Sequence, residues 1–175
     1  MKKYVFKPYS KNFPKLFEKE KRRVVSCIGT KSISIEHVGS TAIPNMGGKG
    51  IMDITIAVIK ENIELVSEQL QKLGYEFRPT ASTPDRLFFR TNLPDREEGI
   101  RIYHIHLTYL RSKDWEELLA FRNYLRSNLR EAKKYAAIKK KAAHLANEDR
   151  EKYIKIKEPT IKGILEKLLK EHSLS

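Results

Sequence analysis

The segment 50–59, which reads GIMDITIAVI, constrains the fold more than any other stretch of the chain. Nearly every position is apolar, without the alternation expected of a strand that has one face in water. Such a run is typical of a central strand covered on both faces. Asp53 interrupts it, and an ionised carboxylate in that setting needs a cation or several N–H donors. Taken alone, Asp53 fits a structural salt bridge better than a functional site.

The remaining pattern predicts strands followed by helices. Strands are expected at 32–38, 75–79, 85–92 and 100–110, with a polar hairpin connection at 94–99. Helices are expected at 11–28, at 61–73 and from Ser112 almost to the end, including one at about 131–147, with a new start or a kink at Pro159. This order predicts an α+β fold, not a doubly wound parallel sheet. We expect one domain over 1–175, strand-rich at about 30–110 and helical at about 112–171.

The charge balance favours anionic partners. The 175 residues carry a formal net charge of +13, with 35 Lys and Arg against 22 Asp and Glu. A single cysteine, Cys27, in an apolar context excludes an internal disulfide and indicates a reducing compartment. No run is long enough to span a membrane, and the start has no apolar signal core. A cytoplasmic protein without a membrane partner is therefore predicted, and its oligomeric state stays open.

The loop before Asp53 has the composition of a phosphate-binding turn. Gly39 allows a phosphate to approach the backbone, Ser40 offers a hydroxyl and an N–H, and Lys49 can supply a cation. An ordinary turn explains the Gly-Ser pair equally well. On a later strand, His104 and His106 point to one face, so that with Asp53 they could form a two-histidine, one-carboxylate metal site. A hydrogen-bonded histidine pair is the simpler alternative.

Two arginines are further candidates for an anion site. Arg122 interrupts the apolar stripe of its helix, so a buried guanidinium there needs a protein carboxylate or a ligand phosphate. An arginine that extends its head to the edge of the stripe is an equal alternative. Arg86, in RLFFR, is a weaker candidate. Tyr135 and Lys139 share a helix face, which packing and solvation explain.

Together these segments resemble the GrpB family, small proteins related to the nucleotidyltransferase fold. The matching stretches are KPYSKNFPKLFEKEK, IEHVGSTAIPNMGGKGIMDI, RLFFR, YHIHL, WEELLAFRNYLRSN and EDREKYIKIKEPTI, in the order of the family from about residue 7 to 165. The resemblance implies a mixed sheet with flanking helices. It also implies that Gly39 and Ser40 hold nucleotide phosphates and that Asp53 is the first of two metal-binding carboxylates.

The sequence departs from the superfamily pattern at the second carboxylate. Thr55 stands in its place, and His104 and His106 stand where a later acidic residue is expected. Two-metal transfer needs anionic ligands for Mg²⁺, whereas imidazole suits softer ions such as Zn²⁺ or Mn²⁺. A divalent metal, whether Mg, Mn or Zn, is expected at Asp53 and the histidines if the site is catalytic.

Three functions follow as hypotheses. The first is a nucleotidyltransferase-like enzyme acting on a nucleotide or phosphorylated metabolite, with Asp53 and Ser40 as catalytic residues. Phosphate would then be bound by the following residues: Gly39, Ser40, Lys49, Arg86 and Arg122. The second is a non-catalytic nucleotide-binding module with a degenerate metal site. The third, RNA binding, rests on charge alone, because no RNP-type aromatic motif is present.

Overall fold

The computed structural model describes residues 5–146 and 149–172, and within them a five-stranded sheet forms the centre. The strands are β1 (Ser32–Val38), β2 (Met52–Val58), β3 (Glu76–Phe77), β4 (Arg86–Asp95) and β5 (Gly99–Tyr109). Their order is β1-β2-β5-β4-β3. β2 and β5 pair in parallel, and the other neighbours pair antiparallel. The sheet is therefore mixed, as predicted.

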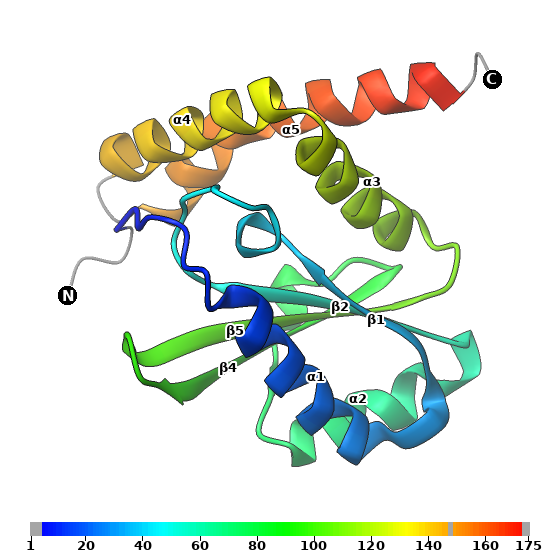
Figure 1. The fold of residues 1–175 in the computed structure, drawn as a ribbon. Helices are drawn as coiled ribbons and strands as arrows, with labels where there is room; N and C mark the ends of the chain where they lie inside the picture. The colour runs from blue at the N-terminus through cyan, green and yellow to red at the C-terminus, as the bar shows by residue number, and fades with distance from the viewer. Residues whose placement is uncertain (1–4, 147–148, 173–175) are drawn as a thin grey trace.

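Helices cover both faces of the sheet (Figure 1). One face carries α1 (Phe13–Ile28) and α2 (Ile63–Lys72), and the other carries α3 (Lys113–Ser127), α4 (Leu129–Ala146) and α5 (Arg150–His172). Short 3-10 helices occupy Gly29–Lys31, Ser40–Ala42, Lys60–Asn62 and Pro79–Ala81. The predicted α+β class is confirmed. In the described ranges, no helix combines the length and the apolarity needed to cross a bilayer.

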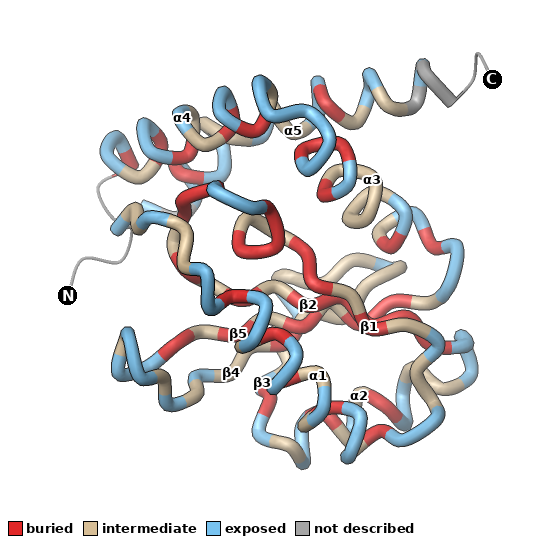
Figure 2. The backbone as a smooth tube through the Cα atoms, in the orientation of Figure 1, coloured by how far each residue is buried: buried red, intermediate tan, exposed pale blue. Residues whose placement is uncertain are grey.

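The apolar run that contains Asp53 forms the central strand β2. Ile54, Ile56 and Val58 are fully buried, as are Ile105 and Leu107 on the adjacent β5. Figure 2 shows buried backbone concentrated in these strands, with helices on either side. Because both faces are covered, apolar residues are favoured at consecutive positions of β2. The sequence lacks alternation here for that reason.

The prediction that a new helix starts at Pro159 is wrong. α5 is one helix from Arg150 to His172, with Pro159 inside it. A proline there removes one backbone hydrogen bond and costs about 3 kcal/mol or more in an isolated helix. Ile161, Ile164 and Leu168 pack into a cluster shared with α3 and α4, and this packing offsets the local cost. Tertiary contact therefore overrides propensity at this position.

Ser112 caps the N-terminus of α3. Its hydroxyl accepts a hydrogen bond from the backbone N–H of Trp115 at 3.2 Å. We expect Ser112→Ala to lower the free energy of unfolding by about 1 kcal/mol, because that N–H loses its acceptor. Urea unfolding would measure the change, with Ser67→Ala inside α2 as the control. An unchanged midpoint in Ser112→Ala would show that the cap contributes nothing.

Candidate functional site

Asp53 and the two histidines come from neighbouring parallel strands. The register of β2 and β5 sets Asp53 opposite His104 and Thr55 opposite His106. The Nδ1 of His104 lies 3.0 Å from Oδ1 of Asp53, and the Nε2 of His106 lies 3.6 Å from the same oxygen. Residues two apart on a strand share a face, so both imidazoles reach the carboxylate. The structure thus brings together three residues that the sequence singled out.

The carboxylate of Asp53 is ionised. Burial alone would raise the pKa of Asp53, but the hydrogen bond with His104 and the nearby ring of His106 outweigh it and hold the pKa well below its ordinary value. Burial lowers the pKa of His106, and Asp53 opposes that shift. Phe88 packs against both imidazoles, with ring centroids 4.8 and 5.1 Å apart. Asp53 is therefore a fixed negative charge held against β5.

The turn after β1 brings Gly39 against this carboxylate. The antiparallel register sets Val38 opposite Asp53, so Gly39 follows directly beside it. Gly39 has φ +68°, and a Cβ added there would lie 2.5 Å from Oδ2 of Asp53. Both the backbone conformation and the lack of space therefore require glycine. Ser40 follows as the first residue of a 3-10 helix.

These elements form one wall of a cavity of about 220 Å³. The residues that line it come from the β1–β2 loop, the two central strands and the helices α4 and α5. They are Gly39, Ser40, Lys49, Ile51, Asp53, His104, Tyr135, Lys139, Tyr153 and Lys157. Among these described residues, Asp53 is the one carboxylate and three are lysines. The cavity therefore has a predominantly positive lining around one negative charge.

The lysines are held by aromatic rings and by the loop. The Nζ atoms of Lys49 and Lys157 each lie 4.4 Å from the ring centroid of Tyr153, a favourable cation–π distance. Lys139 is 5% exposed and donates a hydrogen bond to the carbonyl of Gly47 at 3.2 Å. Burial, with the nearby charges of Lys157 and Lys49, lowers the pKa of Lys139 to about 7. Burial also lowers the pKa of Lys157.

The site prediction from sequence missed five lining residues, which are Ile51 and four residues of the helices. Tyr135 and Lys139 come from α4, and Tyr153 and Lys157 come from α5. Tyr135 and Lys139 are four residues apart and share a face, but this spacing also suits a packed ring and a solvated lysine. A usable signal was the pair of Tyr-x-x-x-Lys spacings, Tyr135 to Lys139 and Tyr153 to Lys157, on two successive helices.

The two arginines lie outside the cavity lining. Arg122 is buried, and its Nη1 donates to Glu36 Oε2 at 2.6 Å and to the carbonyl of His37 at 3.0 Å. Arg86 pairs with Asp114 at 3.3 Å and donates to a backbone carbonyl at 3.2 Å. Each guanidinium thus has a protein carboxylate as its anion. Neither Arg86 nor Arg122 lines the cavity beside the Gly39–Ser40 turn.

The donor set does not fit the two-metal centre of the superfamily. Thr55, in the position of the second carboxylate, is fully buried, and its hydroxyl donates to the carbonyl of His106 at 3.2 Å. It cannot act as a ligand in the cavity. Over residues 5–146 and 149–172, no group of three or more His, Cys, Asp or Glu side chains is arranged to hold a metal ion. Positive charge on the neighbouring lysines further opposes a divalent cation beside Asp53.

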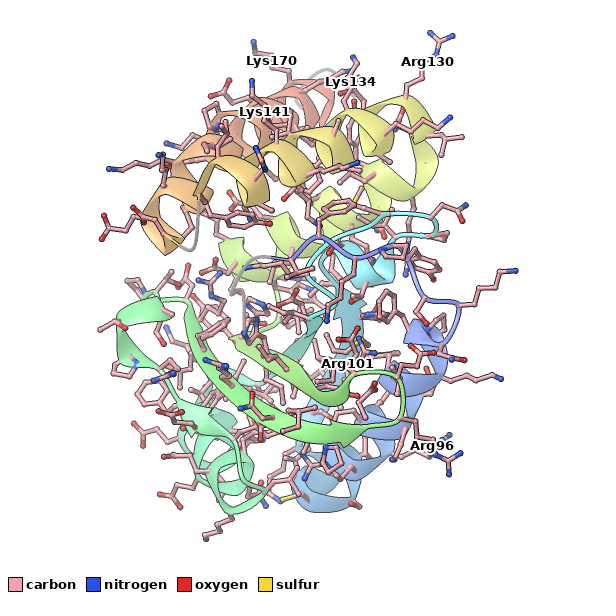
Figure 3. All side chains as sticks on the ribbon, turned by 90° about the vertical axis from the view of Figure 1, so that its left-hand side faces the viewer. Arg96, Arg101, Arg130, Lys134, Lys141 and Lys170 are labelled. Atoms are coloured by element: carbon pink, nitrogen blue, oxygen red, sulfur yellow. The ribbon has the colours of Figure 1, made fainter. Side chains whose placement is uncertain are left out.

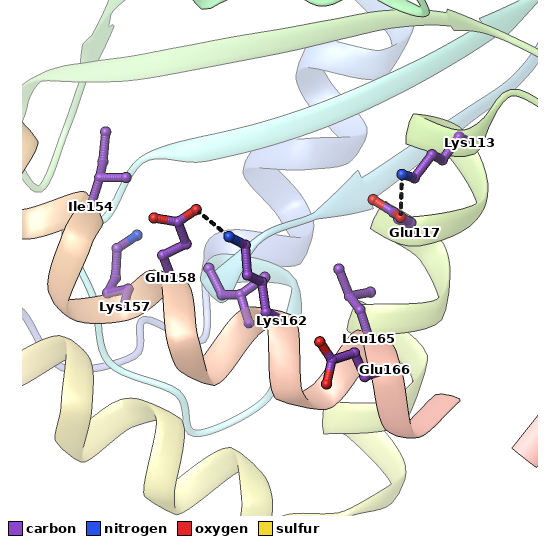
Figure 4. Close-up of a pocket in the computed structure, with 9 residues that line it drawn as sticks. Lys113, Glu117, Ile154, Lys157, Glu158, Lys162, Leu165 and Glu166 are labelled. Atoms are coloured by element: carbon purple, nitrogen blue, oxygen red, sulfur yellow. Dashed lines mark ion pairs between the residues drawn. The ribbon is translucent and has the colours of Figure 1, made fainter. Parts of the chain in front are cut away.

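A larger groove of about 520 Å³ lies between α3 and α5 (Figure 4). Four of its charged side chains form pairs along their own helices, Lys113 with Glu117 at 3.8 Å and Lys162 with Glu158 at 2.9 Å. Lys157 lines both this groove and the smaller cavity. Because the groove lacks the Gly-Ser turn and Asp53, we place the candidate site in the smaller cavity.

Part of the positive charge lies on the outer surface. In Figure 3, Arg130, Lys134 and Lys141 of α4 point away from the body of the molecule. Lys134 pairs with Glu131 at 2.8 Å. Exposed pairs and isolated surface lysines of this kind contribute solubility and general anion attraction. They form no concave site, in contrast to the three lysines of the cavity.

Comparison with known proteins agrees with this architecture. The family described as GrpB protein matches residues 3–167. The UPF0157 protein YqkA of Bacillus subtilis is 34% identical over 157 residues, which is 88% of this chain and 44% of YqkA. The chain therefore spans less than half the length of that relative.

Solved structures give the fold independently. A crystal structure of the conserved protein GrpB from Enterococcus faecalis matches with a TM-score of 0.81 at 27% identity, over 96% of this chain and 99% of that one. The Cid1 poly(U) polymerase matches with a TM-score of 0.50 at 12% identity, over 75% and 41% of the two chains, which shows a likeness of fold alone. With a family match over nearly its whole length and a nucleotidyltransferase-like fold, the chain belongs to the GrpB family.

Proposed function

We propose that the cavity binds the phosphate groups of a nucleotide or of another phosphorylated metabolite. The observation that supports this most directly is the convergence of Lys49, Lys139 and Lys157 with the Gly39–Ser40 turn on one concave space. Ammonium and hydroxyl donors form strong, charge-assisted hydrogen bonds with phosphate oxygens. A volume of about 220 Å³ is below the range usual for a whole drug-sized ligand. The phosphates would therefore occupy the cavity, and the rest of the ligand would extend out of it.

The position of Thr55 favours a binding module over a metal-dependent transferase. Its hydroxyl is engaged within the sheet, so Asp53 has no second carboxylate beside it. Two-metal transfer depends on ligands that offset the charge of both ions. We therefore propose nucleotide binding without nucleotidyl transfer as the function of this cavity. Turnover of a nucleoside triphosphate by the purified protein would argue for the transferase instead.

Lys157→Met is expected to weaken binding of pyrophosphate and ATP by about 10- to 100-fold, because one charged hydrogen-bond donor is lost. Isothermal titration calorimetry at pH 7 in the presence of a chelator would measure the change. Lys162→Met is the matched control. Lys162 lies on the same helix and lines the outer groove, and its substitution removes the same charge. Its affinity should equal that of the parent protein.

Two results would contradict the proposal. The first is no measurable binding of pyrophosphate, ATP or UTP by the folded parent protein. The second is an equal loss of affinity in both lysine variants, which would indicate general charge attraction instead of a built site. Circular dichroism of each variant would confirm that the helical content is unchanged.

A further inference from the structure

The side chains of Lys139 and Ser40 both lie close to Gly48 in the β1–β2 loop. A Cβ added at Gly48 would lie 2.6 Å from Nζ of Lys139 and 2.7 Å from Oγ of Ser40. The absence of a side chain at Gly48 therefore allows an amine from α4 and a hydroxyl from the Gly-Ser turn to approach one another over the loop backbone. Both residues line the cavity. Together the three residues, Ser40, Gly48 and Lys139, form what we call the lysine cradle.

The amine of Lys139 has an unusual environment for a charged group. An ammonium has three N–H donors, and in the described part of the chain Lys139 donates to one acceptor, the carbonyl of Gly47. No carboxylate forms an ion pair with it there. A buried charge without a counterion is strongly disfavoured. An anionic ligand in the cavity would supply both the missing charge and the missing acceptors.

The charged groups that face Lys139 come from each element around the cavity. They are Lys157 on α5, Lys49 in the loop, and Asp53 on β2, with His104 on β5 lining the same space. Burial and the two lysines disfavour the ammonium, and Asp53 opposes them in part, with a pKa of about 7 as the result. Lys139 therefore loses its proton at a much lower pH than an exposed lysine does.

These features differ from those of a metal-dependent phosphate site. In such a site, carboxylates hold divalent ions, and the ions contact the phosphate. Here the cations are covalently part of the chain, and the one carboxylate of the lining is paired with His104. A divalent ion would meet repulsion from three lysines. The lysines can perform the neutralising role themselves.

We propose that the cavity binds phosphate without a metal ion, and that Lys139 takes up a proton when the phosphate binds in the lysine cradle. This inference rests on the proposed function and adds to it the nature of the cations and the dependence on pH. A dianionic phosphate or a pyrophosphate group is the ligand class that fits. The ligand is thereby recognised together with one proton.

Titration of the protein with pyrophosphate in the presence of EDTA, from pH 6 to pH 9, tests this inference. Affinity should fall by about tenfold per pH unit above pH 7, because the proton on Lys139 becomes harder to supply. Near pH 6 the curve should flatten, since Lys139 is already charged and phosphate monoesters themselves protonate at about pH 6. Titration at pH 8 in two buffers of different ionisation enthalpy should give net uptake of protons.

Two variants separate Lys139 from its neighbours. Lys139→Arg carries a permanent charge, so its affinity should lose most of the decline between pH 7 and pH 9. Lys157→Met should bind more weakly but keep that decline. If Lys139→Arg does not fold, the buffer comparison on the parent protein still decides the question.

The outcomes distinguish this inference from the proposed function. Binding that is flat between pH 7 and pH 9, or that disappears with EDTA and returns with Mg²⁺, Mn²⁺ or Zn²⁺, would overturn the lysine cradle and leave phosphate binding intact. Absence of binding at every pH would overturn both. Proton uptake in the parent protein, together with a pH-independent Lys139→Arg variant, would support the inference.

Discussion

Gly48→Ala is expected to weaken pyrophosphate binding by about 100-fold while the protein remains folded. The new methyl group would lie 2.6 Å from the amine of Lys139 and 2.7 Å from the hydroxyl of Ser40, so both donors must move away from the cradle. The loss of two such hydrogen bonds to a charged ligand is about 3 kcal/mol, or on the order of 100-fold in affinity. Calorimetry at pH 7 would measure it.

The fold should tolerate this alanine because the backbone at Gly48 is ordinary. Its φ lies outside the left-handed region, in contrast to Gly39. Gly48 exchanges backbone hydrogen bonds with Lys7, and these do not involve the new methyl group. The flexible end of Lys139 can move. Thermal unfolding should therefore change little.

Gly163→Ala on α5 is the control, since nothing lies within 4 Å of a Cβ added there. That variant should bind as the parent does, and its helix should become slightly more stable. Undiminished pyrophosphate binding by Gly48→Ala would show that the ligand does not enter the cradle. A large fall in thermal stability would show instead that the backbone argument is wrong.

The sequence predicted the part of the site that lies on consecutive or evenly spaced residues. The apolar run around Asp53 indicated a covered strand, and the His-x-His spacing placed His104 and His106 on one face. Their approach to Asp53 depends on parallel pairing between segments 51 residues apart. Local pattern does not specify that pairing. The resemblance to the GrpB family implied a mixed sheet and put the histidines in the place of a later acidic residue, but it did not specify the pairing.

The helical half of the cavity could not be predicted in the same way. Lys139 and Lys157 lie on amphipathic helices where most lysines are exposed, and sequence alone does not show which lysine faces inward. Arg122 illustrates the opposite case. The apolar stripe left a buried position and an edge position open for Arg122. The side chain is buried, and its partner is Glu36, a half-buried carboxylate far away in the chain. Burial follows from periodicity, whereas the identity of a long-range partner requires the fold.

Asp53→Asn gives the sharpest distinction between the two kinds of phosphate site. If lysines supply the cations, removal of the one carboxylate of the lining should strengthen pyrophosphate binding in EDTA by roughly tenfold. This gain in affinity corresponds to the repulsion energy that is removed, which is that of two unit charges about 10 Å apart at an effective dielectric constant of about 20. Because Asp53 raises the pKa of Lys139, its removal lowers that pKa, so the gain should be largest near pH 6 and should shrink towards pH 9.

A metal-dependent site makes the reverse prediction for the same variant. There Asp53 would hold the ion, so Asp53→Asn would lose binding and any turnover that Mn²⁺ or Zn²⁺ supports. Glu117→Gln in the outer groove removes the same charge and is the control, with affinity expected to match the parent. If Asp53→Asn binds pyrophosphate more weakly than the parent, and the parent binds it only when metal is added, the lysines do not replace the ions. Tighter binding that ignores both metal and chelator would mean that they do, since a carboxylate repels a phosphate unless a cation stands between them.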